Sequence, residues 1–283
     1  MVVCPGCGKE NGASFRFCMG CGAGMPRRPR GLQEDAPAAL SADETASLER
    51  PPDSRRSERV TWTATVTPPV PSRLELISIA IDGSATASHR LNEGPTVFGK
   101  NRGGAFARDR FMSPNHGSFT PRGERLLVRD EDSLNGIYRK LRAGDPCPIA
   151  SGQCFRVGQA LLRFDALKAK APDHEKVAWL GAATDNVAGR VLIVLGRNST
   201  GDAFVVPMSG LQIGRERGDI VFPDDGYVSG AHCRLNVEAG RVVIIDLGSS
   251  NGTFVRLSGE TEVGPGEVLL LGQQLFRVAL ASR

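Results

Sequence analysis

The feature that most constrains the fold is an internal repeat. Segments 94–164 and 210–278 carry the same residue types in the same order. The pairs separated by 116 positions are Ser113 and Ser229, His116 and His232, Asp130 and Asp246, Asn135 and Asn251, and Gly136 and Gly252. Near the end of each segment, FRVGQALLRF matches LLLGQQLFRV with a slightly different separation. A shared separation that shifts by a residue or two in loops indicates a duplicated domain.

Each copy has the pattern of a β-structure. Short apolar runs such as LELISIAI and RVLIVLG end at turns that contain Gly, Asn or Asp, and no stretch shows a clear helical period. Strands of this length and spacing are typical of an antiparallel sandwich. We therefore predict an all-β chain with two antiparallel β-sandwiches, at 73–167 and 189–283, joined by a linker at 168–188.

The first 25 residues contain two Cys-x-x-Cys pairs, and a glycine follows each pair. Four thiolates on two tight turns suit tetrahedral zinc, and so short a segment needs metal to fold. We predict a structural zinc ribbon at 1–25, similar to the short ribbons at the N-termini of many bacterial proteins. Its ligands would be Cys4, Cys7, Cys18 and Cys21.

Residues 26–72 are rich in Pro, Ala, Ser and charged residues and lack apolar periodicity, which predicts a disordered linker. The stretch TWTATVTPP within it has alternating threonines. This stretch would serve either as a kinase substrate or as a strand that packs on the next domain through Trp62 and Val66. The candidate phosphoacceptors are Thr45, Thr61, Thr63, Thr65 and Thr67.

The net charge and the hydropathy of the chain limit the classes of binding partner that we expect. A net charge of +4 is too mild to argue for nucleic acid. The N-terminus lacks a signal-peptide pattern, and the longest apolar runs are far shorter than a membrane span. We expect a soluble cytoplasmic protein with no membrane partner.

Three separated motifs in the second copy carry a family resemblance. Gly-Arg, Ser-x-x-His and Ser-Asn-Gly-Thr occur in this order on a predicted sandwich, at positions 214–215, 229–232 and 250–253. This combination resembles the forkhead-associated (FHA) domain, which binds phosphothreonine peptides through loops at one end of a β-sandwich. The resemblance covers 189–283 well and 73–167 more loosely.

The resemblance implies a role for each motif residue. A phosphothreonine needs a fixed cation and several convergent donors. The phosphopeptide-binding residues would be Arg215, Ser229, Gly230, Ser250 and Asn251, with structural support from His232, Gly214 and Gly252. Arg215 would grip the phosphate, Gly230 would offer only its backbone, and Asn251 would bind the ligand's main chain. The alternative is a plain surface arginine and ordinary hairpin chemistry.

The first copy departs from this pattern. Its divergent site comprises Lys100, Ser113, His116 and Asn135. Lysine lacks the two-pronged grip of arginine, Pro114 removes an N–H group, and Leu134 replaces a small hydroxyl residue. The first copy is therefore less suited to phosphate, unless Arg102, Arg108 or Arg110 compensates from the loop. The alternative is a scaffold domain that packs on its twin or on a partner protein.

We predict a non-catalytic adaptor in Ser/Thr-kinase signalling. Its partners would be phosphothreonine proteins, such as a kinase or its substrates. Ser229, His232 and Asp246 match the residue types of a hydrolase triad, but VSGAH is not a nucleophile elbow. The alternatives are a nucleic-acid binder acting through the zinc ribbon and a phosphate-independent assembly scaffold.

Overall fold

The computed structural model describes residues 2–3, 8, 10–11, 70–80, 82–167 and 184–281. The chain divides into two compact units, 1–63 and 64–283. In the first unit, β1 (Val2–Val3) pairs with β2 (Glu10–Asn11). The four predicted zinc ligands and the five candidate phosphoacceptor threonines lie outside the described residues, so the ribbon, the linker and these threonines stay predictions. Within the described ranges, no helix has the length and apolar character needed to cross a membrane.

In the described part of the second unit, almost all regular secondary structure is β-strand. The first copy contributes β3 (Pro71–Ile79), β4 (Ala85–Asn92), β5 (Thr96–Phe98), β6 (Gly117–Arg122), β7 (Arg125–Asp130), β8 (Ile137–Lys140), β9 (Cys147–Pro148), β10 (Cys154–Val157) and β11 (Ala160–Ala166). Two short helical turns, η1 (Lys100–Arg102) and α1 (Gly104–Arg108), interrupt the loop after β5. The sequence did not predict α1, which is anchored by the buried side chain of Phe106.

The second copy repeats this order, except that a short strand, β15, lies in the loop where the first copy has η1 and α1. Its strands are β12 (Val187–Gly196), β13 (Ser199–Pro207), β14 (Leu211–Gly214), β15 (Ile220–Val221), β16 (Cys233–Glu238), β17 (Arg241–Asp246), β18 (Thr253–Arg256), β19 (Thr261–Val263), β20 (Val268–Leu271) and β21 (Gln274–Leu280). The predicted all-β class thus agrees with the described structure.

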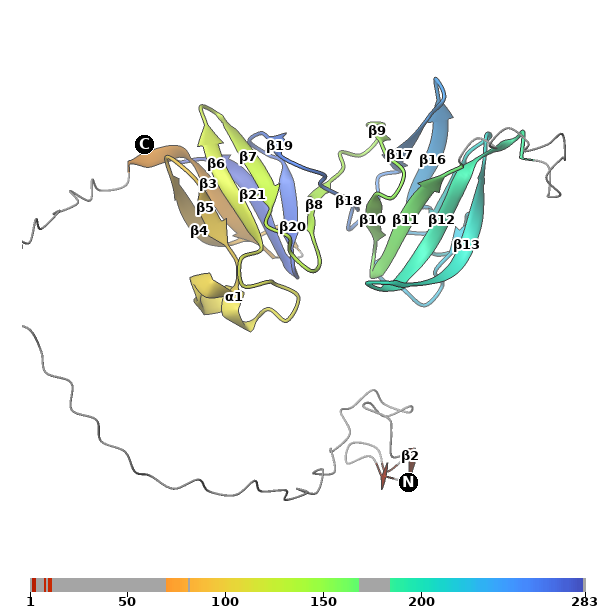
Figure 1. Ribbon diagram of the computed structural model, residues 1–283, viewed down its shortest axis with the longest axis horizontal. Helices are drawn as coiled ribbons and strands as arrows, with labels where there is room; N and C mark the ends of the chain where they lie inside the picture. Colours follow the sequence, from red (N-terminus) through yellow and green to blue (C-terminus); the bar gives the residue numbers. More distant parts are fainter. Residues whose placement is uncertain are drawn as a thin grey trace, which may run out of the picture. The chain divides into compact units, whose positions relative to one another are not determined.

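The two copies exchange their last strands. One sheet of ten strands runs in the order β13-β12-β11-β10-β18-β8-β20-β21-β3-β4. In this sheet β10 and β11, from the first copy, pair with β18 and β12 of the second. Conversely, β20 and β21 pair with β8 and β3 of the first copy. The exchange extends to the facing sheets, where β9 pairs with β17 and β19 pairs with β7 (Figure 1).

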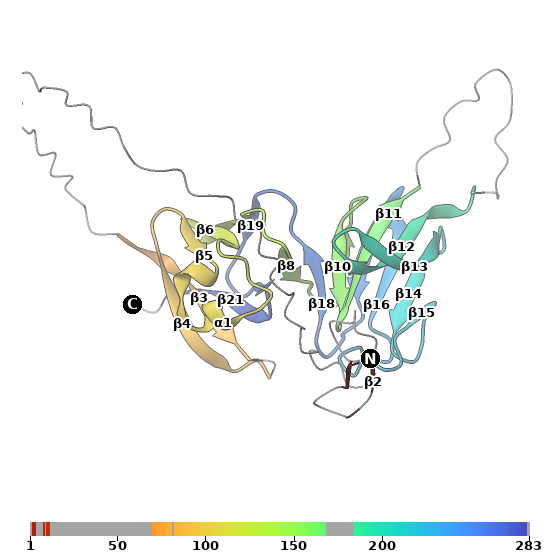
Figure 2. The same ribbon diagram turned by 60° about the horizontal axis from the view of Figure 1, so that its bottom comes forward.

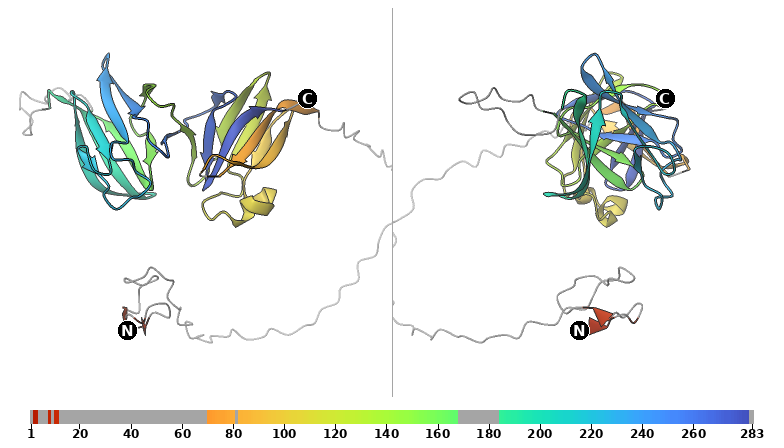
Figure 3. Two further views of the ribbon diagram at one scale, coloured as in Figure 1. Left: turned by 180° about the vertical axis from the view of Figure 1, so that it is seen from behind. Right: turned by 90° about the vertical axis from the view of Figure 1, so that its right-hand side faces the viewer.

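Each sandwich therefore has a core drawn from both copies. We define sandwich 1 as 70–80, 82–140 and 257–281, and sandwich 2 as 141–167 and 184–256. The core of sandwich 1 includes Leu74 and Phe119 of the first copy together with Phe276 of the second. The core of sandwich 2 includes Phe164 of the first copy together with Leu235 of the second. Figure 3 shows the orange and dark blue strands in one sandwich.

This strand pairing differs from the predicted boundaries, 73–167 and 189–283. The physical reason lies in the two final hairpins. FRVGQALLRF and LLLGQQLFRV have nearly the same alternation of apolar residues around a Gly-Gln turn. Either hairpin therefore fits the open edge of either copy, and the pattern does not say which edge it fills.

The two sandwiches meet where β8 pairs with β18 (Figure 2). The outer face of this joint carries a small buried cluster of Tyr138, Phe254 and Leu270. Burial there raises the pKa of Tyr138 to about 12.

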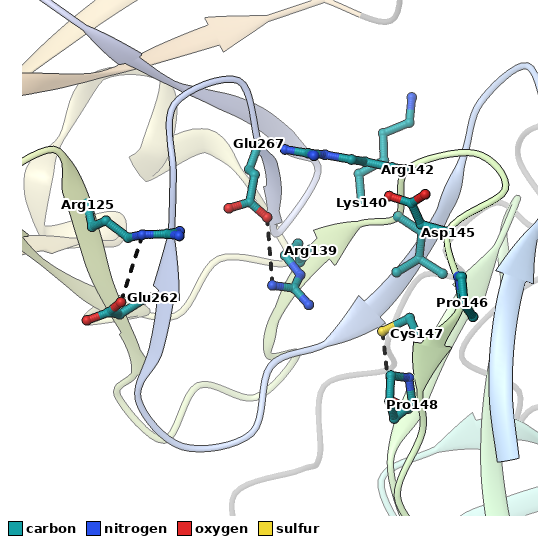
Figure 4. A pocket seen from close by; sticks show the side chains of 11 residues that line it. Arg125, Arg139, Lys140, Arg142, Asp145, Pro146, Cys147, Pro148, Glu262 and Glu267 are labelled. Atoms are coloured by element: carbon teal, nitrogen blue, oxygen red, sulfur yellow. Dashed lines mark hydrogen bonds and ion pairs between the residues drawn. The ribbon is translucent and has the colours of Figure 1, made fainter. Parts of the chain in front are cut away.

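Ion pairs between the copies lie near this joint. A cavity of about 370 Å³ contains Arg139, which lies 3.7 Å from Glu267, and Arg125, which lies 4.0 Å from Glu262 (Figure 4). Both pairs join an arginine of the first copy to a glutamate of the second. The Arg125 and Glu262 side chains are 59% exposed, so their pair adds little stability.

Candidate functional site

The site predicted in the second copy lies on the loops at one end of sandwich 2. Gly214 ends β14, and a Cβ atom there would overlap the carbonyl oxygens of Gly230 and Arg217. The next residue, Arg215, donates its backbone N–H to the Ser229 carbonyl oxygen at 2.9 Å. The absence of a side chain at Gly214 thus lets the arginine loop and the serine loop touch.

A buried histidine braces the serine loop. The ring Nδ1 atom of His232 accepts a hydrogen bond from the Ser229 N–H at 3.0 Å. This bond leaves the proton on Nε2, which donates to the Gly252 carbonyl oxygen at 3.2 Å. His232 is fully buried and connects the Ser229 loop to the Asn251 turn.

The Asn251 turn is also fastened directly to the serine loop. The Ser229 hydroxyl accepts a hydrogen bond from the Ser250 N–H at 3.1 Å. The Asn251 side-chain amide donates to the Tyr227 carbonyl oxygen at 2.9 Å. The predicted loops therefore form one connected rim, with Ser250 exposed and Asn251 half-buried.

The Asp246 carboxylate holds the turn before Asn251 in place, and Ser249 is one of its hydrogen-bond donors. The Asp246 carboxylate accepts hydrogen bonds from the Gly248 and Ser249 N–H groups at 3.0 and 2.9 Å. It also accepts from the Ser249 and Thr253 hydroxyls, each at 2.6 Å. Burial raises the pKa of Asp246, but the hydroxyl bonds from Ser249 and Thr253, the Ser249 N–H bond and the interaction with His232 together leave the pKa below its usual value. Sequence reasoning missed Ser249 and Thr253, although an aspartate three residues before a serine is a signal for such a turn.

The bracing histidine makes the site sensitive to pH. Burial lowers the pKa of His232 below the usual 6.5, so the unfolded chain binds a proton more readily than the folded chain. We expect the free energy of unfolding to decrease as pH falls below about 6.5. Asp246 has a lowered pKa and would lose its contribution only below about pH 4, outside this window.

Chemical denaturation at pH 7.5 and pH 5.5 would measure this decrease, with His232→Gln as the comparison variant. The pH dependence should be weaker in that variant, because glutamine does not titrate. Equal pH dependence in both proteins would contradict this role for His232.

The Arg215 guanidinium lies at the surface of the rim. Its side chain is 39% exposed and pairs with the neighbouring Glu216 at 2.7 Å. The hydrogen bond from Arg215 lowers the pKa of the Glu216 carboxyl, which is itself solvent-exposed. A ligand dianion could replace this exposed carboxylate at small cost.

The first copy builds the same frame. Ser113 donates its N–H to His116 Nδ1 at 3.0 Å, and His116 Nε2 bonds to the Gly136 carbonyl oxygen at 3.0 Å. The Leu134 N–H donates to the Ser113 hydroxyl at 3.0 Å, and Asn135 donates to the Phe111 carbonyl oxygen at 2.8 Å.

The side chains presented by the first copy differ from those of the second copy. Lys100 occupies the arginine position, and the Leu134 side chain is 59% exposed where the second copy has a serine. Arg102 lies 4.3 Å from the centre of the Phe98 ring and is occupied in a cation–π contact. The first copy therefore keeps the loop geometry and the Ser113 hydroxyl, but it lacks the arginine and the second hydroxyl group, which Lys100 and Leu134 replace.

The exchanged hairpins reach the site loops. In sandwich 2, the Asp225 carboxylate accepts a hydrogen bond from the Gln159 N–H of the first copy at 2.7 Å. In sandwich 1, Asp109 accepts from the Gln273 N–H of the second copy at 2.9 Å. Sequence reasoning missed both contacts, because they follow from the strand exchange.

The serine, histidine and aspartate of the second copy do not form a hydrolase arrangement. The Ser229 hydroxyl accepts from Ser250, while both His232 ring nitrogens bond to backbone groups. Asp246 bonds to the turn rather than to the histidine ring. The geometry needed between nucleophile, base and orienting acid is missing from these three residues.

Comparisons with known proteins identify an FHA domain in part of the chain. The FHA domain model matches residues 211–272. The oxoglutarate dehydrogenase inhibitor of Corynebacterium efficiens is 33% identical over 98 residues, covering 34% of this chain and 68% of the relative. An FHA domain-containing protein of Arabidopsis thaliana is 41% identical over 73 residues, covering 24% of this chain and 19% of the relative. The chain thus spans only about a fifth of that plant protein's length.

Two solved structures show local similarity. One, described as a structural and functional analysis of phosphothreonine-dependent FHA domain interactions, is 25% identical, covers 30% of this chain and 92% of its own, and has a TM-score of 0.19. The other, Mycobacterium tuberculosis EmbR with a low-affinity phosphopeptide, is 22% identical, covers 29% and 23%, and has a TM-score of 0.17. The family-model match and the corynebacterial relative establish that this chain belongs to the FHA-domain family.

Proposed function

We propose that this protein is a non-catalytic adaptor that binds phosphothreonine peptides through the rim of sandwich 2. The observation that carries the proposal is the hydrogen-bonded frame around His232 and Asp246. This frame holds the Arg215, Ser229 and Ser250 loops together while leaving Arg215 half-buried and Ser250 exposed. Membership of the FHA family supports the same ligand class.

The rim has the donors that a phosphate dianion requires. The Arg215 guanidinium can form two parallel bonds to phosphate oxygens. The Ser229 and Ser250 hydroxyls and the Gly230 backbone supply neutral donors, and Asn251 would bind the peptide main chain. The partners would be phosphoproteins of a Ser/Thr-kinase pathway in the cytoplasm, with the predicted zinc ribbon as a separate docking element.

Arg215→Ala tests the proposal. We expect a loss of about 2 kcal/mol, roughly 30-fold in Kd, because charge-assisted bonds to phosphate disappear. Isothermal titration of the full chain with a phosphothreonine peptide and its unphosphorylated twin would measure both the loss and the phosphate dependence.

Lys100→Ala is the matched control, since Lys100 occupies the same position in the first copy. Its affinity should equal that of the unmodified protein. Equal binding of both peptides, unaffected by Arg215→Ala, would refute the proposal and favour phosphate-independent assembly.

A further inference from the structure

The loops of sandwich 1 form a surface that the proposed phosphate site does not use. Their hydrogen bonds match those of the sandwich 2 rim, because Ser113 bonds to His116 and Asn135 bonds to the Phe111 carbonyl oxygen. The frame is therefore common to both copies, and only the side chains that it presents differ. We define rim 1 as the side chains of Lys100, Arg102, Arg108, Arg110, Phe111 and Leu134.

Two large apolar side chains are exposed on rim 1. Phe111 is 47% exposed and Leu134 is 59% exposed. The side chain of Asn135, the residue after Leu134, donates to the Phe111 carbonyl oxygen at 2.8 Å, so the two apolar residues lie on adjoining loops. The second copy has a tyrosine and a serine at these positions. Exposed apolar side chains that lie close together indicate a protein interface more strongly than a single one does.

Rim 1 is also strongly cationic. The loop 99–116 contains all four of its basic residues and one acidic residue, Asp109. Asp109 is buried and accepts hydrogen bonds from two backbone N–H groups, each at 2.9 Å. No ion pair among the described residues involves any of the four basic side chains. The matching loop of the second copy, 214–232, contains two arginines and four acidic residues, so the two loops carry opposite net charge.

Rim 1 suits several carboxylates better than one phosphate dianion. Lys100 and Arg102 lie in η1, whereas Arg108 ends α1, which projects from the strands of sandwich 1 (Figure 1). Cations on two separate segments can each contact a different carboxylate, while a phosphate needs donors that converge on one point. The exposed Leu134 side chain offers a phosphate no donor. The charge of rim 1 therefore favours an acidic ligand that carries no phosphate.

We propose that rim 1 binds an unphosphorylated acidic segment of a partner protein. Phe111 and Leu134 bury one apolar side chain of that segment, and the four loop cations contact its carboxylates. A protein fits better than a nucleic acid, because the aliphatic Leu134 side chain cannot stack on a base. The inference goes beyond the proposed function, since the chain would hold this partner on sandwich 1 and a phosphoprotein on sandwich 2.

An array of unphosphorylated peptides tests the proposal. The array varies the number of glutamates and places one leucine or one alanine among them, and the tightest-binding peptide is titrated into the full chain by fluorescence anisotropy. Leu134→Ser, which introduces the residue of the second copy, should weaken binding about tenfold, because the apolar contact is lost. Arg108→Gln should weaken binding about threefold and reduce its salt dependence, as expected for an exposed charge pair.

Leu195→Ser is the matched control, because Leu195 is 68% exposed but lies in β12 of sandwich 2. It should leave the affinity for the acidic peptide unchanged. Binding of a phosphothreonine peptide to sandwich 2 should be the same in Leu134→Ser as in the unmodified protein, which separates a local effect on rim 1 from a loss of fold.

Four results would overturn the proposal. The first is that no acidic peptide on the array binds, and the second is that replacing its glutamates by glutamine leaves the affinity unchanged. The third is an equal loss of affinity in Leu134→Ser and Leu195→Ser. The fourth is a single-stranded oligonucleotide that binds more tightly than any acidic peptide and loses affinity in Arg108→Gln, because rim 1 would then be a nucleic-acid site.

Discussion

Phe276→Ala is expected to destabilise sandwich 1 by about 3–5 kcal/mol, although Phe276 belongs to the second copy. Its ring is fully buried. It stacks on Phe106 with 5.9 Å between ring centres and lies 6.1 Å from Phe98, both in the first copy. Removing it leaves a cavity between these rings.

The matched control is Phe164→Ala, since Phe164 belongs to the first copy but lies in the core of sandwich 2. Hydrogen exchange followed by NMR would locate each effect. Phe276→Ala should accelerate exchange around Leu74 and Phe119, and Phe164→Ala around Leu211 and Leu235. The reverse assignment would show that each copy folds with its own final hairpin.

The fragment 141–256 is expected to fold without the rest of the chain and to bind the phosphothreonine peptide. Among the described residues, the core of sandwich 2 extends from Leu141 to Val255 and contains none outside this range. The fragment also contains every residue of the proposed phosphate site. It would begin with the exchanged hairpin, so its strand order along the chain would be that of a circular permutant of a single repeat.

Circular dichroism during thermal unfolding would show whether 141–256 melts cooperatively. The shorter fragment 189–256 is the control, because it lacks β10 and β11 and thus the core residues Phe155 and Phe164. We expect it to remain unfolded, since an open sheet edge and a missing core wall cannot be balanced by the remaining contacts. An unfolded 141–256 fragment would contradict sandwich 2 as an independent unit.

Local sequence patterns predicted much of the fold. The all-β class, the repeat and the turns at Asn135 and Asn251 follow from residue types and spacing. The closeness of the Arg215, Ser229 and Ser250 loops was inferred from the family resemblance, and the hydrogen bonds of His232 and Asp246 give its physical basis.

These sequence patterns could not predict the strand exchange. The two final hairpins have equivalent apolar faces, so local chemistry is the same in the exchanged and sequential arrangements. The choice depends on how the short connections at Leu141 and Leu257 cross between the sandwiches. The position of Lys140 beside Gly252 is a consequence of that choice and could not be inferred separately.

Because β20 and β21 complete sandwich 1, the order of synthesis and the order of assembly differ in this chain. A ribosome releases the first copy's strands long before the residues that close its sheet exist. Sandwich 2 is formed by one continuous segment and can assemble first. Until β20 and β21 are synthesised, β3 and β8 of sandwich 1 have unpaired edges. Unpaired strand edges promote aggregation during translation. The pairing of β20 and β21 with sandwich 1 is therefore the last step in the folding of the second unit.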